Sequence, residues 1–203
     1  MSLELWNTLA TFGTFVVIAA TAIAAIVQLR HARTSNQIAA LNEFRETTET
    51  PEFQAAQTFI ATQLNTVLND PAFRYQLINR AARTVENQAL IAKIRAVGNF
   101  WDVIGLLVKA GFVDRDVVLE VMAGNVVTDW HALAPVEAID RRAGNLGGWD
   151  NFEYLTVLSQ NWIAAHPSGT YPPGMRRIEV VDKWADEDER YAAALDPSQP
   201  QRS

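Results

Sequence analysis

Two polar residues interrupt the long apolar stretch at residues 96–108, and they are the residues best placed to perform chemistry. They are Asn99 and Asp102, which would lie one turn apart on the same face of a helix. A helix that is apolar nearly all round lies at the centre of a domain, so both polar groups are expected on a buried helix. A buried carboxylate needs a cation or several hydrogen-bond donors, because it otherwise takes up a proton.

Two interpretations of Asp102 stay open. In the structural one, an arginine from a neighbouring helix pairs with Asp102 and fixes the register of a helical bundle. In the functional one, Asn99 and Asp102 line a pocket with Glu153 and Arg141, where they bind a ligand or move a proton. The structural interpretation is favoured, because structural ion pairs also shift pKa values and no catalytic pattern accompanies these residues. The arginines that could pair with Asp102 are Arg74, Arg80, Arg95, Arg141 and Arg142.

Other residues that could perform chemistry lack the spacing that it needs. The three histidines, His31, His131 and His166, have no histidine or carboxylate four residues away, which argues against a metal pair on a helix. The chain has no cysteine, no serine in a nucleophile elbow and no glycine-rich phosphate loop. We therefore expect no enzyme activity, no metal and no cofactor.

The stretch from Leu5 to Leu29 holds twenty-five residues without an ionisable side chain. A bilayer core about 30 Å thick needs roughly 20 apolar residues in a helix, so this stretch predicts a transmembrane helix. Residues 96–108 make a poor second span, because only six residues separate Asp102 from Lys109.

The charges that flank the first stretch favour a retained span over a cleaved signal peptide. Only Glu4 precedes it, whereas Arg30 and Arg33 follow it, the reverse of the order in a signal peptide. The positive-inside rule then places the N-terminus outside and everything after Arg33 in the cytoplasm. The predicted location is the inner (cytoplasmic) membrane, crossed once, with the lipid bilayer as a partner.

Small residues follow one face of the predicted span. Gly13, Val17, Ala20 and Ala24, preceded by Ala10, recur at spacings of three and four residues. Such a row lets a second membrane helix approach closely, which predicts self-association or docking to another membrane protein. The alternative is that the row only reflects how common alanine is in membrane helices.

The remaining chain predicts an all-α domain, since helical periodicity recurs and no stretch alternates at period two. The span helix is expected to continue towards Thr48, and Trp149 and Trp184 are candidates for exposed aromatics. Further helices are expected at 52–67, 71–83, 87–110, 150–166 and 175–184. Another begins after Asp114 and carries Val117 to Met122; its helical period continues from Val126 to Ile139, with a break or bend at Gly124-Asn125 and a bend or restart at Pro135. The chain thus divides into an anchor (1–30), a multi-helix bundle (31–166) and a linker with an acidic tail (167–203).

Several segments together resemble DUF4760, a family of small bacterial single-span proteins whose cytosolic domain has no known function. They are Asn99 to Val108, Gly111 to Asp114, Trp130 with Pro135, Arg141-Arg142 and Phe152-Glu153, and the likeness covers residues 30–165. Asp102 stands where the family more often has glutamate. The resemblance implies a membrane-anchored cytosolic helical domain and implies no activity.

These observations predict a membrane-anchored interaction module, a partner or accessory subunit at the bacterial inner membrane. A net charge of −6 without any lysine or arginine block argues against nucleic acid as a partner. The predicted partners are therefore another membrane protein or a second copy of the chain. The alternative is a ligand-sensing or hydrolytic domain built around Asn99 and Asp102.

Overall fold

The computed structural model describes residues 21, 24–25, 28 and 37–195. Most of the predicted span lies outside these residues, and so do Gly13, Val17 and Ala20 of its predicted interface. Ala24 is helical and exposed. Within the described ranges, no helix is both long enough and apolar enough to cross a membrane.

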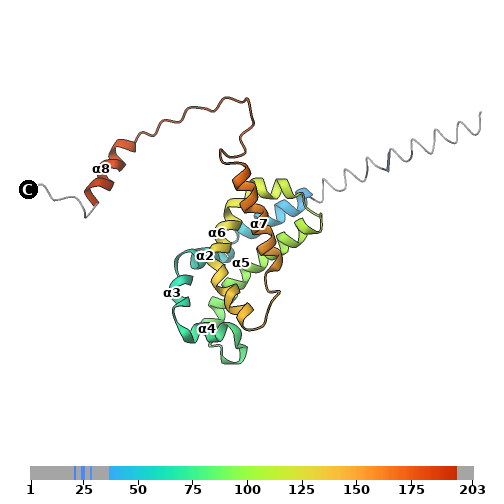
Figure 1. Ribbon diagram of the computed structural model, residues 1–203, viewed down its shortest axis with the longest axis vertical. Coiled ribbons are helices and arrows are strands. Elements are labelled where there is room, and N and C mark those ends of the chain that lie inside the picture. Colours follow the sequence, from blue (N-terminus) through green and yellow to red (C-terminus); the bar gives the residue numbers. More distant parts are fainter. Residues whose placement is uncertain (1–20, 22–23, 26–27, 29–36, 196–203) are drawn as a thin grey trace, which may run out of the picture. The chain divides into compact units, whose positions relative to one another are not determined.

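The described chain is all-α, and no strand occurs in it (Figure 1). Residues 37–49 are helical, and the later helices are α2 (Pro51–Thr62), α3 (Leu64–Leu68), α4 (Pro71–Ile78), η1 (Arg80–Ala82), α5 (Val85–Lys109), α6 (Arg115–Arg142), α7 (Asp150–Ala165) and α8 (Ala185–Leu195). The chain divides into two compact units, of which the first ends at Gly169 and the second begins at Thr170.

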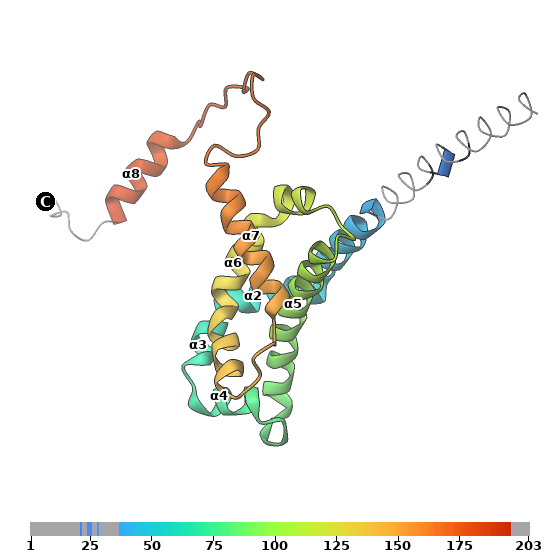
Figure 2. The same ribbon diagram turned by 45° about the vertical axis from the view of Figure 1, so that its right-hand side comes forward.

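Helix α5 is the central element of the first unit, and α2, α6 and α7 all pack against it (Figure 2). Its most extensive neighbour is α7, which also packs along α6. Aromatic side chains fill the middle, where Phe152 of α7 lies 6.3 Å from the ring of Trp101 and 5.0 Å from that of Trp130. The three longest helices therefore share one core.

Capping residues begin several helices where the sequence predicts them. The Thr50 hydroxyl accepts a hydrogen bond from the Phe53 amide at 3.3 Å, just before Pro51 opens α2. The Asp70 carboxylate accepts one from the Ala72 amide at 2.8 Å. Helix α5 ends at Lys109, and Gly111 follows with a φ of 73°, the left-handed conformation that stops many helices.

Helix α6 runs as one helix through Gly124, Asn125 and Pro135, so neither a break at Gly124-Asn125 nor a restart at Pro135 occurs. Figure 2 shows the start of α6 running across the rest of the helix, which agrees with the bend that is the other form of the prediction at Gly124-Asn125. Proline inside a helix removes one backbone hydrogen bond, and glycine costs about 1 kcal/mol relative to alanine. Val126 and Leu133, which lie between these positions, are fully buried. Since burial of one such side chain is worth roughly 1.5–3 kcal/mol, packing outweighs the local preferences.

Two other predicted helices are shorter than expected. The helix predicted over 52–67 is divided at Gln63 into α2 and α3, and the helix predicted over 71–83 ends at Ile78 before the single turn of η1. Near the division, the Thr62 hydroxyl donates back to the Thr58 carbonyl at 2.7 Å. Such bonds compete with the helical ladder and weaken its end.

The second unit places its helix later than predicted. Residues 175–184 form no helix, whereas the acidic run that follows begins α8, with three acids in its first turn. Acids at a helix N-terminus are stabilised by the helix dipole. Trp184 is exposed, with 64% of its surface accessible, but Trp149 is buried at 5%, so the prediction of an exposed Trp149 is wrong.

Candidate functional site

One face of α5 receives the start of α7, and two glycines on that face make the contact close. A Cβ atom on Gly98 would overlap the indole ring of Trp149, and one on Gly105 would overlap the backbone carbonyl of Asn151. Asn99 and Asp102 lie between these glycines in the sequence. The candidate residues therefore belong to a helix–helix junction, which we call the α5–α7 junction.

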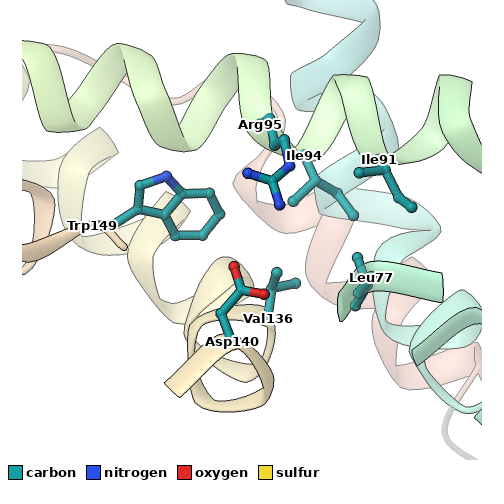
Figure 3. A pocket seen from close by; sticks show the side chains of 7 residues that line it. All are labelled: Leu77, Ile91, Ile94, Arg95, Val136, Asp140 and Trp149. Carbon is teal, nitrogen blue, oxygen red and sulfur yellow. The ribbon is translucent and has the colours of Figure 1, made fainter. Parts of the chain in front are cut away.

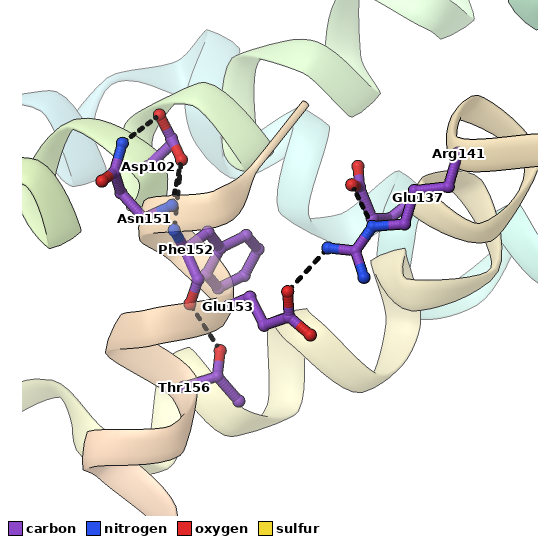
Figure 4. A network of polar contacts seen from close by, with 7 residues as sticks. All are labelled: Asp102, Glu137, Arg141, Asn151, Phe152, Glu153 and Thr156. Carbon is purple, nitrogen blue, oxygen red and sulfur yellow. Dashed lines mark hydrogen bonds and ion pairs between the residues drawn. The ribbon is translucent and has the colours of Figure 1, made fainter. Parts of the chain in front are cut away.

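Asp102 caps α7 from a different helix. The residue before α7, Trp149, offers no side-chain hydrogen bond to the first turn. Instead, one carboxylate oxygen of Asp102 accepts from the Asn151 amide at 3.0 Å and the Phe152 amide at 3.1 Å (Figure 4). The other oxygen accepts from the Asn151 side-chain amide at 3.3 Å. The carboxylate thus satisfies amides that no helical carbonyl can reach, at the positive end of the helix dipole.

Asn99 reinforces the same junction. Its side-chain oxygen accepts a hydrogen bond from the indole nitrogen of Trp149 at 3.1 Å, although Asn99 itself is exposed. Trp149 in turn packs against Phe152, with ring centres 6.4 Å apart. Asn99 and Asp102 therefore act together, as their spacing suggests, and what they hold is the first turn of α7.

The predicted arginine partner of Asp102 is wrong. No ion pair among the described residues includes Asp102, which is half-buried rather than sealed in the core. Three N–H donors, two from the Asn151 and Phe152 backbone and one from the Asn151 side chain, occupy the carboxylate oxygens in place of a cation. Of the five candidate arginines, Arg74 donates to the Leu68 carbonyl at 2.6 Å, and Arg80 and Arg95 line a hollow elsewhere.

Arg141 and Glu153 do meet, but in a separate network that includes Glu137. The Arg141 guanidinium donates to Glu153 at 2.6 Å and to Glu137 at 2.8 Å (Figure 4). The hydrogen bonds to Glu153 and then Glu137 raise the pKa of Arg141 above its usual value. Because Glu137 and Arg141 lie on α6 and Glu153 on α7, the network ties these two helices together.

Glu137 is a residue that the sequence analysis missed. Its side chain is almost fully buried, and its second carboxylate oxygen has no hydrogen-bond partner. A Cβ atom on Gly148 would come within 2.9 Å of that oxygen, so the glycine leaves it room. The available signal was the spacing of Glu137 and Arg141, four residues apart on one helix.

Asp129 is a second missed carboxylate, and it joins three helices. One of its oxygens accepts from the Trp101 indole nitrogen of α5 at 2.7 Å and from the Gln57 amide of α2 at 3.3 Å. Burial raises the pKa of Asp129, while the hydrogen bonds from Trp101 and Gln57 oppose that rise. Asp129 therefore links α6 to α5 and α2, as Asp102 links α5 to α7.

The histidines do not form a site among the described residues. His166 stacks on Trp162 with ring centres 4.3 Å apart, and its Nδ1 lies 2.8 Å from the Trp162 carbonyl. Within the part of the chain that the structure describes, no three His, Cys, Asp or Glu side chains gather as metal ligands.

Comparison with known proteins identifies the family. A family model, described as a domain of unknown function (DUF4760), matches residues 15–162. No curated protein and no solved structure matches the chain. The matched segment covers most of the chain and contains α2 to α6, the α5–α7 junction and nearly all of α7. The chain therefore belongs to the DUF4760 family.

Proposed function

We propose that this protein is a membrane-tethered interaction module whose docking surface lies where α5 turns into α6. The apolar stretch at residues 5–29 would cross the inner membrane once, with the helical domain on the cytoplasmic side. The observation that carries the proposal is a group of exposed apolar side chains close to the point where the tether joins the domain.

The docking surface, called here the corner surface, comes from one short segment of chain. It consists of Val103, Leu106, Phe112, Val117 and Val121, all of which are exposed. Phe112 and Val121 are the most accessible, at 69% and 68%. Five large apolar side chains are thus exposed within residues 103–121, and exposed apolar surface of this kind is typical of a site that a partner covers.

The corner surface lies at the end of the domain that is nearest to the tether. Helix 37–49 and α2 together run antiparallel to α5. Phe44 contacts Phe100, with ring centres 6.2 Å apart, whereas the later Phe59 lies near the earlier Lys93, whose Nζ is 5.5 Å from the centre of the Phe59 ring. The beginning of helix 37–49 is therefore close to the C-terminal end of α5, and Figures 1 and 2 both show the blue helix beside the turn from α5 into α6.

This placement favours a partner that is itself anchored in the membrane. A tether raises the effective concentration of two membrane-bound proteins, so a small apolar surface is enough for binding. A second copy of this chain is one such partner. The alternative, a ligand site at Asn99 and Asp102, has less support because Trp149, Asn151 and Phe152 occupy their oxygens.

Photo-crosslinking in native membranes tests the docking surface. A benzophenone-bearing phenylalanine analogue at position 112 should form a defined protein adduct. The same analogue at position 85, where Val85 is 88% exposed at the opposite end of α5, is the matched control and should form none. A lack of protein adducts at position 112, or the same adduct at position 85, would overturn the proposal.

The absence of cysteine makes the membrane topology directly measurable. Single substitutions Ser2→Cys and Ser203→Cys provide one thiol on each side of the predicted span. A membrane-impermeant maleimide added to intact spheroplasts should label the first variant and not the second. Labelling of the Ser203→Cys variant, or recovery of the chain in the aqueous fraction without detergent, would contradict the tether.

A further inference from the structure

We infer that a hollow lined by Arg80, Arg83 and Arg95 binds a small phosphate-bearing anion. The hollow has a volume of about 200 Å³, and Asp140 and Asn145 line its other side. It is independent of the corner surface, because Arg95 precedes the end of α5 by fourteen residues, or roughly 21 Å of helix. The inference does not rest on the partner proposed above.

Two segments, η1 with its cap residue and α5, bring the guanidinium groups together. Arg80 belongs to η1, Arg83 follows η1 directly, and Arg95 comes from the first half of α5, while Asp140 lies near the end of α6. Residues that are distant in the sequence thus meet at one opening. No lysine or arginine run marks the site in the sequence.

Arg83 is held in place before any ligand binds. Its Nε donates to the Gln76 carbonyl at 2.9 Å, and one terminal nitrogen donates to the Leu77 carbonyl at 2.7 Å. These bonds satisfy the end of α4 and leave the other terminal nitrogen available. A guanidinium that is already fixed loses less conformational freedom when it binds an anion.

The positive charge of the hollow is only partly neutralised. The side chains of Arg80 and Arg95 donate no hydrogen bond within the described part of the chain, and no ion pair there includes Asp140. Burial, followed by the charges of Arg95 and Arg80, lowers the pKa of Arg83. Three cations and one carboxylate leave an excess of two positive charges, in a chain whose net charge is −6.

The hollow continues into a smaller cavity with apolar walls. Arg95 and Asp140 line both, and Figure 3 shows them facing the same space as the Trp149 ring, with Ile94 and Val136 nearby. The inner cavity measures about 10 Å³, which holds no more than about one water molecule. The inner cavity is too small for a phosphate, so the anion would bind in the outer hollow.

Phosphate is the ligand chemistry that fits this arrangement. Planar guanidinium groups bind phosphate oxygens through paired hydrogen bonds, and a phosphomonoester dianion would match the excess charge. The volume accommodates a phosphate with a small attached group. Asp140 would disfavour ligands that carry more negative charge than a phosphomonoester. Burial raises the pKa of the Asp140 carboxyl, and the positive charges of Arg95 and Arg83 oppose that rise.

Calorimetric titration of the full chain in a non-ionic detergent tests the site, with inorganic phosphate and glycerol phosphate as probes at constant ionic strength. We expect saturable binding by the unaltered protein. Arg95→Gln and Arg80→Gln should each weaken it roughly tenfold, because each removes a charged hydrogen-bond donor. Arg142→Gln is the matched control, since Arg142 is exposed and outside the hollow, and should change the affinity less than about twofold.

One variant should bind phosphate more tightly instead of more weakly, so the test remains decisive even if an arginine variant unfolds. Asp140→Asn removes the only carboxylate among the lining residues and should tighten phosphate binding several-fold. The inference is overturned by absence of saturable binding, by weaker binding in Asp140→Asn, or by an equal loss in Arg142→Gln. Binding of phosphatidate in mixed micelles without any binding of glycerol phosphate would also overturn it, because the source would then be a lipid.

Discussion

Helix α5 carries two polar regions that differ in how their charges are compensated. At the α5–α7 junction, Asp102 accepts from two backbone amides and one side-chain amide, and the glycines on either side leave no free space. At the hollow, Arg95 precedes Asp102 by only seven residues, but its side chain donates no hydrogen bond within the described part of the chain and faces open volume. Compensated polar groups hold the fold together, whereas uncompensated ones are available to a ligand.

The buried and half-buried acids of this domain differ in the same way, in whether a donor already occupies their oxygens. Asp102, Asp129 and Glu137 each bind donors from a neighbouring helix or their own. Of these four acids, only Asp140 lines a hollow that also contains arginines. Asp140 forms no ion pair within the described chain. Each substitution below disturbs one side of this difference.

The largest effect is expected from Gly105→Ala at the junction. Its Cβ atom would overlap the Asn151 carbonyl, which is backbone and has little freedom to move. We expect a loss of about 3 kcal/mol in the free energy of unfolding, measured by urea titration with tryptophan fluorescence in detergent. Gly124→Ala on α6 is the control, because a Cβ atom there meets nothing within 4 Å, and it should stabilise by roughly 0.5–1 kcal/mol. Equal effects of the two substitutions would contradict the close contact.

Asp102→Ala should lower the free energy of unfolding by about 2 kcal/mol, since it leaves the Asn151 and Phe152 amides without their acceptor. Asp102→Asn should cost only about 1 kcal/mol, because an amide oxygen can replace the carboxylate oxygen that both amides share. The same unfolding titration measures both. If Asp102→Asn cost as much as a broken buried ion pair, about 3–5 kcal/mol, the carboxylate would have a cationic partner after all.

The Glu137–Arg141–Glu153 network should respond unequally to loss of its two acids. Glu137 is buried and Glu153 is 44% exposed, so Glu137→Ala should destabilise by about 1–2 kcal/mol. Glu153→Ala should cost under about 1 kcal/mol, since water screens the exposed ion pair. Added salt should reduce the Glu153 effect and leave the Glu137 effect nearly unchanged. The opposite order would show that the exposed pair ties α7 to α6.

The smallest effect concerns the dependence of stability on pH. Because burial raises the folded-state pKa of Asp129, its protonated form is favoured by folding. The stability that it contributes is present below the unfolded pKa and is lost as pH rises through the folded pKa. The difference in unfolding free energy between the unaltered protein and Asp129→Asn should therefore shift in favour of the unaltered protein as pH falls from 7 to 4. A shift towards Asp129→Asn would indicate that its hydrogen bonds outweigh burial.

Local signals in the sequence predict most helix boundaries of this fold. Thr50, Asp70 and Gly111 act through their immediate neighbours, and each marks a helix end where expected. Local reasoning fails at Pro135, since the core on both sides of it decides the outcome.

The polar sites depend on contacts between distant segments, which spacing alone cannot specify. Asn99 and Asp102 could be predicted to act together, because one helical turn separates them. Their partners could not, since the donors are backbone amides almost fifty residues later. The hollow likewise combines Arg80 and Arg83 of one short segment with Arg95 of α5 and Asp140 of α6, and nothing in the residue pattern brings these segments together.

The most direct test of the capping role of Asp102 is amide hydrogen exchange at Asn151 and Phe152, followed by mass spectrometry of peptides covering the start of α7. We predict that both amides are protected in the unaltered protein and exchange much faster in Asp102→Ala, while Phe53 at the start of α2 keeps its protection. Unchanged protection of Asn151 and Phe152 in Asp102→Ala would contradict the account.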